Sequence, residues 1–418
     1  MQRTVSAPTV QHSRARAWGK RLGLVIFWLF LAWLLIEVLL RIFFFSLPPR
    51  LQLVLQPVHV TPFGDRKLMP EPIWQPDRKY QTITRPVQNL EQYGTAEVGF
   101  RVNTTSFSWA DKRVAFRLEP EQTNRYVAGV AVGDSFTFCF SEEAECWVQR
   151  LSESSGRNIL NLGITSTGSV SHLRVLQDFG KPFKPRVVFW QWYGNDANED
   201  YGLAQLDPSI QPEGNPAPES SNPPPAADQT NWLDENSAFY VVVKMLLGQD
   251  DHYEASLQFL DRETAEEGNL RLMFGRPYLW GAFDTSLPQN QYGWELTKRA
   301  ILAAENDLSY DDGTEGELVV LLMPTKEQVY WELAEPLIGA DKMAVLNANY
   351  DVMLNFCQQE KLTCIDLLPV FKPYAEQGEQ LYYTTDIHLN PRGNDVLAAY
   401  LNQWLTEHPE LFEGAPES

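Results

Sequence analysis

The chain has 418 residues, of which 44% are hydrophobic and 12% aromatic, and its formal net charge at pH 7 is −20. This composition excludes global disorder and is sufficient for one large α/β domain with appended segments. Nucleic acid and anionic lipid are poor partners for so acidic a chain, because both repel negative charge.

An apolar stretch near the amino terminus predicts a transmembrane helix. Residues 22–40 are almost wholly apolar and would span about 28 Å as a helix, close to the thickness of the hydrocarbon layer of a bilayer. We expect a cytoplasmic tail over residues 1–21 and a transmembrane helix over residues 22–47. By the positive-inside rule the rest of the chain is then extracytoplasmic, because the tail has no acid and holds Arg3, Arg14, Arg16, Lys20 and Arg21.

Glu37 is the one acid within the apolar stretch. Arg41 lies one helical turn beyond it, so an i,i+4 ion pair near the outer interface would lower the cost of the charge. A cleaved signal peptide is the alternative to a membrane anchor. The anchor is favoured, because the apolar run exceeds a typical signal-peptide core and residues 46–49 are a poor cleavage site.

The next segments differ in composition. Residues 48–122 are rich in Pro, Gln and charged residues and are interpreted as a juxtamembrane stalk with some extended structure. Residues 123–411 are predicted to form one folded domain, followed by a tail over residues 412–418. Within the domain, residues 204–230 cluster Pro, Ser, Asn and Glu, which predicts a disordered insertion, and a helix is expected to start near Phe239.

Apolar strands alternate with helices from residue 126 onward, which predicts a three-layer α/β/α fold with a five-stranded parallel sheet. The expected strands are residues 127–132, 158–162, 186–193, 318–323 and 363–367. The expected helices are residues 142–154, 169–179, 294–307, 326–337 and 341–360, with a last helix after Pro391.

Three short segments carry candidate chemistry. Ser135 follows the first strand in Gly-Asp-Ser, and His388 follows Asp386 in Asp-Ile-His. A serine hydroxyl becomes a nucleophile when an imidazole takes its proton and a carboxylate orients that imidazole. Asn195 follows the third strand, where its amide can donate to an oxyanion, and ligands bind beyond the carboxyl ends of parallel strands.

Each segment alone has a plainer interpretation as a capped turn. His172 and the other histidines lack a comparable context, and we expect them to be surface or packing residues. Asp134 and Asp196 are expected to cap loops. Four aromatic residues are interpreted as core packing, with a sugar-binding platform as the alternative: Trp192, Tyr193, Trp280 and Trp294.

Taken together, the order of these blocks resembles the SGNH or GDSL hydrolase superfamily over about residues 123–411. The resemblance is closest to membrane-anchored bacterial members whose first block is G-D-S-F-T-F and whose later segment is P-T-K-E-Q-V-Y, matched here by residues 133–138 and 324–330. It implies a flavodoxin-like SGNH fold with Ser135 as nucleophile, His388 as general base and acid, and Asp386 as its orienting carboxylate.

The resemblance also implies an oxyanion hole formed by the Ser135 N–H, the Asn195 side chain and a backbone N–H of the turn over residues 161–168. Ser166 stands where many members have glycine, and a positive φ there would be strained, so Gly168 is the alternative third donor. Tyr193 replaces another frequent glycine. Many members place the acid at the position of Thr385, whereas Asp386 fits those with the acid two residues before the histidine.

Four cysteines form two pairs close in sequence. Cys139 with Cys146 and Cys357 with Cys364 are plausible disulfides outside the cytoplasm, with reduced core cysteines as the alternative. No spacing typical of a zinc or nucleotide site occurs, so we expect no metal and no cofactor.

The chain is therefore predicted to be a membrane-anchored, extracytoplasmic serine esterase that removes O-acetyl or other O-acyl groups from cell-surface carbohydrate. An O-acyltransferase would use the same triad. A catalytically silent scaffold that binds glycan or an assembly partner, and a lipid esterase at the membrane face, are further alternatives. The sequence does not define the oligomeric state.

Overall fold

The computed structural model describes residues 11–48, 51, 54–55, 73–93, 97–211, 216–218, 232–249 and 258–414. The chain divides into two compact units, one of Met1–Met69 with Ala227–Glu254 and one of Pro70–Ala226 with Ala255–Ser418. Most of the predicted insertion at 204–230 lies outside the described residues, as do parts of the two predicted tails and of the predicted stalk.

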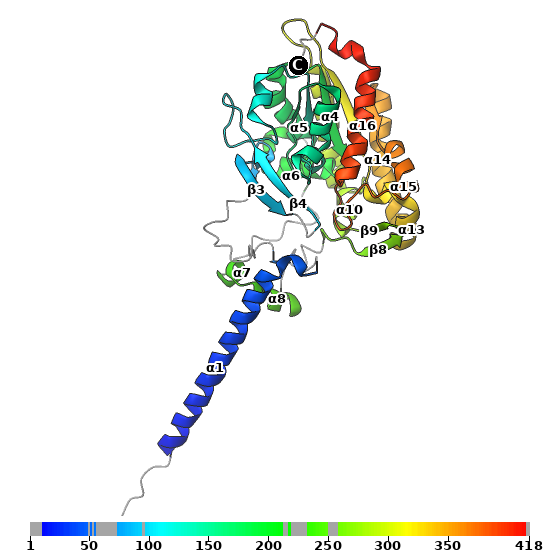
Figure 1. Cartoon of the computed structure of the whole chain (residues 1–418). Helices are drawn as coiled ribbons and strands as arrows, with labels where there is room; N and C mark the ends of the chain where they lie inside the picture. The colour runs from blue at the N-terminus through cyan, green and yellow to red at the C-terminus, as the bar shows by residue number, and fades with distance from the viewer. Residues whose placement is uncertain are drawn as a thin grey trace, which may run out of the picture. The chain divides into compact units, whose positions relative to one another are not determined.

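The first unit is helical. Its longest helix is α1 (Gln11–Ile42), in which Trp18–Ile42 is long and apolar enough to cross a membrane (Figure 1). The helix ends five residues before the predicted boundary at 47, and a 3₁₀ turn, η1 (Phe44–Ser46), follows it. The unit also contains α7 (Trp232–Asn236) and α8 (Ala238–Leu246), and α8 includes the helix start expected near Phe239.

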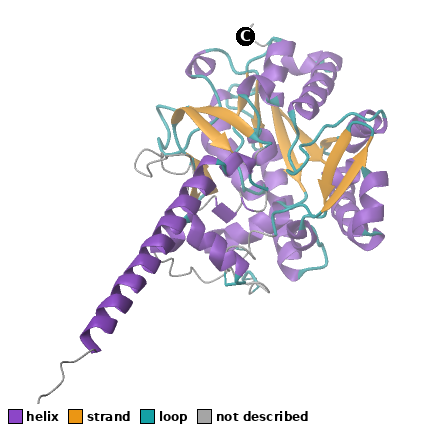
Figure 2. Cartoon of the chain, turned by 60° about the horizontal axis from the view of Figure 1, so that its bottom comes forward, coloured by secondary structure: helices purple, strands orange, loops and turns teal. Residues whose placement is uncertain are grey.

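The second unit is built around a five-stranded parallel sheet, as predicted (Figure 2). Its strands are β5 (Gly129–Val132), β6 (Ile159–Asn161), β7 (Val187–Tyr193), β10 (Glu317–Met323) and β11 (Thr363–Asp366). The order is β11-β10-β7-β5-β6, so the chain goes outward from β5 to β6 and then returns to β7 on the other side of β5. The carboxyl ends of β5 and β7 therefore border the topological switch point, where ligands bind in such sheets.

Helices cover both faces of the sheet, because alternate residues of the buried strands point to opposite sides. Ala131, Phe189 and Leu321 pack on the face covered by α4 (Trp147–Ser155) and α16 (Pro391–Glu407). Val130, Trp190 and Val320 pack on the face covered by α5 (Ser169–Val175) and α11 (Pro288–Asn306). The remaining elements of eight or more residues in this unit are α6 (Asp196–Leu206), α13 (Trp331–Ile338), α14 (Ala340–Glu360) and α15 (Leu368–Glu376).

Residues 70–122 differ from the stalk that their composition suggested. They belong to the second unit and contain two antiparallel hairpins, formed by β1 (Trp74–Asp77) with β2 (Gln81–Thr84) and by β3 (Val87–Tyr93) with β4 (Gly99–Thr104). Phe107, Val114 and Phe116 after these hairpins are buried in the core of the second unit. This part of the chain, in which apolar residues are scattered and show no long periodicity, thus folds as short strands and loops that pack on the second unit.

A third hairpin and one helix break were also not predicted. β8 (Glu263–Glu267) and β9 (Leu270–Phe274) pair in antiparallel fashion, although β8 is mostly charged and exposed. The helix expected over residues 326–337 is two helices, α12 (Lys326–Val329) and α13, separated at Tyr330, whose φ and ψ of −106° and 47° are not helical.

Candidate active site

Ser135 lies at the end of a fully buried strand. β5 ends at Val132, and Gly133 follows at a position where a Cβ atom would lie 2.2 Å from Thr137 Oγ1, so only glycine fits the turn. The Asp134 carboxylate accepts the Phe136 N–H at 2.8 Å and caps the next helix, in the role expected for it. That helix, α3 (Ser135–Phe138), has four residues, so a helix dipole adds little at Ser135.

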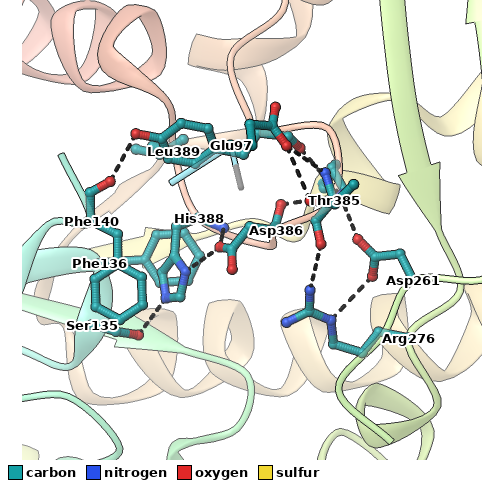
Figure 3. Close-up of polar contacts among 12 residues, drawn as sticks. Glu97, Ser135, Phe136, Phe140, Asp261, Arg276, Thr385, Asp386, His388 and Leu389 are labelled. Carbon is teal, nitrogen blue, oxygen red and sulfur yellow. Dashed lines mark hydrogen bonds and ion pairs between the residues drawn. The ribbon is translucent and has the colours of Figure 1, made fainter. Parts of the chain in front are cut away.

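The structure brings Ser135, His388 and Asp386 together. His388 Nε2 lies 2.6 Å from Ser135 Oγ, and His388 Nδ1 lies 2.5 Å from Asp386 Oδ1 (Figure 3). Both residues of the Asp-x-His segment are buried, in the loop between α15 and α16, and 253 positions separate the serine from the histidine. The series hydroxyl, imidazole and carboxylate has the geometry of a serine hydrolase triad.

Two aromatic rings hold the imidazole between them. The ring centroid of His388 is 4.2 Å from that of Phe140 and 4.9 Å from that of Phe136. Phe136 belongs to α3, and Phe140 follows that helix. Phe136 also packs on Tyr193 at 4.6 Å. Tyr193 is fully buried, so this replacement of a frequent glycine fills the wall behind the triad.

Asp386 is ionised by its surroundings. Burial alone would raise its pKa, but His388 and the Arg276 guanidinium outweigh burial and hold the pKa well below its ordinary value. Arg276 donates to the Thr385 carbonyl at 3.1 Å and to Asp261 at 3.1 Å (Figure 3). The carboxylate is thus negative at neutral pH and can stabilise an imidazolium.

Lys326 anchors the loop that carries Asp386 and His388. Its ammonium is fully buried, 2.8 Å from Asp261, and donates at 3.1 Å to the carbonyls of both Thr384 and Asp386. Asp261 and these two carbonyls match the three N–H donors of the ammonium, which explains how a lysine is tolerated at 0% exposure.

The segment Pro324–Tyr330, which carried the more specific part of the sequence resemblance, supports the same loop. The Pro324 carbonyl accepts the Tyr382 hydroxyl at 2.8 Å, and the Tyr330 hydroxyl bridges the Glu379 carbonyl and the Leu381 N–H, each at 2.7 Å. The sequence assigned no role to Lys326, Arg276 or Asp261. The one signal in the sequence was the motif that contains Lys326. Nothing in the sequence connects Lys326 with Arg276 or Asp261.

Thr385 stands at the position where many SGNH hydrolases have the acid that orients the histidine. In this chain its backbone instead binds a carboxylate, that of Glu97. Its N–H donates to Glu97 at 2.9 Å, and the Thr384 N–H donates to the other Glu97 oxygen at 2.5 Å. Glu97 comes from the segment that the sequence suggested was a stalk. The Glu97 carboxylate, from a distant part of the chain, thus binds the backbone of the loop that carries Asp386 and His388.

Asn195 follows β7 and is nearly buried. Its Nδ2 donates to the Tyr278 hydroxyl at 3.0 Å, and that hydroxyl is 3.3 Å from Glu199 Oε1. Gln81 Nε2 donates to the other Glu199 oxygen at 2.6 Å. Burial raises the pKa of Glu199, and burial and the Glu199 charge raise the pKa of Tyr278 well above its ordinary value, so the hydroxyl stays protonated. The amide has a second N–H for a ligand.

Ser166 and Gly168 lie in the loop between β6 and α5. Ser166 has a φ of 55°, so the strain expected at this replaced glycine is present. Gly168 has a negative φ of −104°, but a Cβ there would lie 2.5 Å from Asp200 Oδ1. Gly168 is therefore required by close packing, whereas Ser166 occupies the left-handed conformation.

The other singled-out residues have structural surroundings. Cys139 is joined to Cys146, and Cys357 to Cys364. His172 is buried, which lowers its pKa to about 3, and it lies 3.2 Å from Thr167 Oγ1. Asp196 accepts the Ser169 hydroxyl at 2.7 Å. Among the residues described, no group of three or more His, Cys, Asp and Glu side chains is arranged to hold a metal ion.

Comparison with protein families gives one match. Residues 289–418 match a family model described as the SGNH hydrolase-like domain of the acetyltransferase AlgX. This range contains Lys326, Asp386 and His388 and begins well after Ser135. No match was found among curated proteins.

Several solved structures are similar at low identity. A carbohydrate acetylesterase, Est24 from Sinorhizobium meliloti, has 9% identity and a TM-score of 0.32, covering 67% of this chain and 99% of its own. The aryl esterase of M. smegmatis has 10% identity and a TM-score of 0.31, covering 67% and 99%. A mutant of the acetylxylan esterase Axe2 from Geobacillus stearothermophilus has 11% identity and a TM-score of 0.30, covering 66% and 92%.

The matched range includes the strands β10 and β11 of the flavodoxin-like sheet and the loop that carries Asp386 and His388. Residues 289–418 of the chain are thus similar to an SGNH hydrolase-like domain.

Proposed function

We propose that the chain is a membrane-anchored serine esterase that cleaves O-acetyl or other O-acyl esters of carbohydrate through Ser135, His388 and Asp386. The observation that carries the proposal is the pair of short contacts on the two imidazole nitrogens, to Ser135 Oγ and to Asp386 Oδ1. An imidazole so placed has one nitrogen fixed as a donor and the other available as a base.

The reaction begins at Ser135. Asp386 accepts a hydrogen bond from the His388 Nδ1–H, so Nε2 is free to take the hydroxyl proton as Ser135 Oγ attacks the ester carbonyl. The Ser135 N–H, one N–H of the Asn195 amide and a backbone N–H of the loop that contains Ser166 and Gly168 stabilise the oxyanion. His388 then gives its proton to the departing sugar oxygen, and an acyl-serine remains.

Water or a second sugar hydroxyl resolves the acyl-serine. His388 removes a proton from that nucleophile, and Ser135 leaves with the proton after the second tetrahedral intermediate collapses. With water the protein is an esterase, and with a sugar hydroxyl it is an O-acyltransferase. The acetyltransferase named in the family description favours keeping the transferase as the second candidate.

The apolar span Trp18–Ile42 supports the proposed membrane anchor. The basic, acid-free tail before it supports a cytoplasmic amino terminus and an extracytoplasmic triad, by the positive-inside rule. Cell-surface carbohydrate lies on that side of the membrane, which favours it as the ester substrate.

Ester hydrolysis by the full-length protein tests the proposal. Ser135→Ala should reduce turnover of p-nitrophenyl acetate by about 10⁴-fold or more, and Ser154→Ala, at an exposed serine, should leave it unchanged. A fluorophosphonate should label wild type at Ser135. Equal turnover by wild type and Ser135→Ala, with no Ser135 adduct, would favour the silent scaffold instead.

The competing substrates need separate measurements. Turnover that rises with acyl chain length would favour the lipid esterase. Acyl transfer to a glycan acceptor that exceeds hydrolysis would favour the O-acyltransferase.

A further inference from the structure

Glu37, the single acid in the apolar part of α1, binds more than its expected partner Arg41. Its two carboxylate oxygens accept the N–H groups of Ala238 at 3.0 Å and Phe239 at 2.9 Å, and the Ser237 hydroxyl at 3.0 Å. These groups form the amino-terminal end of α8, where backbone N–H groups have no partner within the helix. Glu37 therefore caps α8 from another helix, in favourable alignment with its dipole.

This cap fixes the level of α8 along α1. Glu37 lies five residues before Ile42, the last residue of the candidate membrane span, which corresponds to about 7.5 Å of helix rise. Arg41 reinforces the attachment, because its guanidinium donates to Glu37 at 2.6 Å and to the Asn236 carbonyl at 3.0 Å. The start of α8 is thus level with the last turns of the span.

α8 has one covered face and one open apolar end. Ala238 and Val241 are buried in a cluster with Phe44, Val54 and Leu55 of the segment after α1. Leu246 and Leu247 are 74% and 64% exposed.

The preceding helix adds another open apolar side chain. Trp232 of α7 is 70% exposed, while Lys244 of α8 is paired with Asp234 of α7 at 2.8 Å. Among the side chains of these two helices whose exposure the structure describes, the large exposed ones are therefore apolar. They lie beside a helix whose own apolar residues are exposed along the span.

We propose that residues 232–247 form a second membrane-binding element, which lies in the headgroup and acyl boundary of the bilayer at the carboxy-terminal end of α1. The occupant of the open surface is lipid, because that surface continues the lipid-facing surface of α1 and because Glu37 fixes it at the depth of the interface. A tryptophan and leucines on short helices at this depth are typical of interfacial elements.

The position of this element in the chain has a consequence for the catalytic unit. Residues 227–254 interrupt the second unit, which the chain enters near residue 70, leaves near 226 and enters again near 255. Three covalent connections thus join the membrane-bound unit to the catalytic unit, where a single stalk would give one. The proposal rests on the membrane anchor of the proposed function and is independent of the triad.

Spin labels on the full-length protein in phosphatidylcholine nanodiscs test it. The four native cysteines are paired, so a nitroxide reports only on an introduced cysteine. Leu246→Cys probes the open end of α8, Leu34→Cys probes the span, and Lys112→Cys probes an exposed site in the other unit. We expect the collision rate of the label at 246 with a water-soluble nickel complex to be several-fold lower than that of the label at 112. Its collision rate with molecular oxygen should remain high.

The two other outcomes at position 246 each overturn the proposal. Nickel collision equal to that at 112 would place α8 in water, and low collision with both reagents would show a protein partner or a second copy over it. A label at 34 open to nickel would reject the anchor as well. Loss of ester hydrolysis with a lipid-exposed label at 246 would reject only the proposed catalytic function.

Glu37→Leu tests the cap. It removes the acceptor for three donors of α8 and makes the span more apolar, so the label at 34 should be unchanged. The nickel collision rate at 246 should rise several-fold. An unchanged rate at 246 would show that α8 does not depend on Glu37 for its depth, which would overturn the proposed cap.

Discussion

Asp386 holds His388 through two contacts of one oxygen atom: Oδ1 accepts the His388 backbone N–H at 2.9 Å and lies 2.5 Å from His388 Nδ1. The backbone contact forms a turn within the Asp-x-His segment, and the ring contact sets the direction of the imidazole. A spacing of two residues thus makes the carboxylate a constraint on both the main chain and the side chain of its partner.

Asp386→Asn should reduce kcat by about 10³- to 10⁴-fold with the fold preserved, because an amide at this position favours the imidazole tautomer with the proton on Nε2. That nitrogen can then no longer take the Ser135 proton. Steady-state kinetics on an acetyl ester measure the effect, with the exposed Asp395→Asn as control. A kcat within a few-fold of wild type would mean that Asp386 does not orient the base.

Lys326→Met should lower both stability and kcat. The substitution keeps the apolar stem but leaves Asp261 with Arg276 alone and removes a donor from the Thr384 and Asp386 carbonyls, which costs about 3–5 kcal/mol of unfolding free energy by analogy with broken buried pairs. Urea unfolding measures the stability. Lys298→Met, on the surface beside Glu295, should change it by less than about 1 kcal/mol. Equal effects of the two variants would contradict the anchoring role.

Tyr278→Phe should reduce kcat about 10-fold with little change in KM, because Asn195 loses the hydroxyl that holds its amide. Asn195→Ala should have a larger effect, about 10²- to 10³-fold, since it removes the oxyanion donor itself. Tyr374→Phe is the matched control, because Tyr374 belongs to α15 and packs against the Arg392 guanidinium. If the Tyr278 variant raised KM alone, Tyr278 would be a substrate-binding residue instead.

Asp200 makes stability depend on pH. Burial raises its pKa to about 7, although the Thr297 hydroxyl and the Val170 N–H, which both donate to it, oppose this effect. Between about pH 4 and pH 7 the folded state keeps a proton that the unfolded chain has lost, so the unfolding free energy falls as the pH rises through this window. At about 1.4 kcal/mol per pKa unit the loss is of the order of 4 kcal/mol.

Asp200→Asn removes this titration and keeps most of the shape. Its stability relative to wild type should increase from pH 4 to pH 8, as measured by urea unfolding across that range. The exposed Asp311→Asn should show no such trend. A difference between Asp200→Asn and wild type that is constant with pH would contradict the raised pKa.

The sheet could be predicted from the sequence because its strands are continuous apolar runs, which is how strands covered on both faces appear. The hairpins could not, since β8 is charged and exposed and β1 to β4 are short and contain Pro and Gln among few apolar residues. Their positions depend on contacts such as those of Phe107 and Phe116 with the core, which no local pattern encodes.

The candidate site divides in the same way. Ser135, Asp386, His388 and Asn195 stand at strand ends or in short segments with chemistry of their own, so the sequence by itself determined these residues and the order of the blocks. Only the tertiary structure decided what holds them: Lys326, Arg276 and Asp261 under the catalytic loop, Glu97 over it, and Tyr278 against Asn195. The physical reason is that a buried charge is stable only where distant segments bring its partner to it, and such a pairing leaves no periodicity or spacing in the chain.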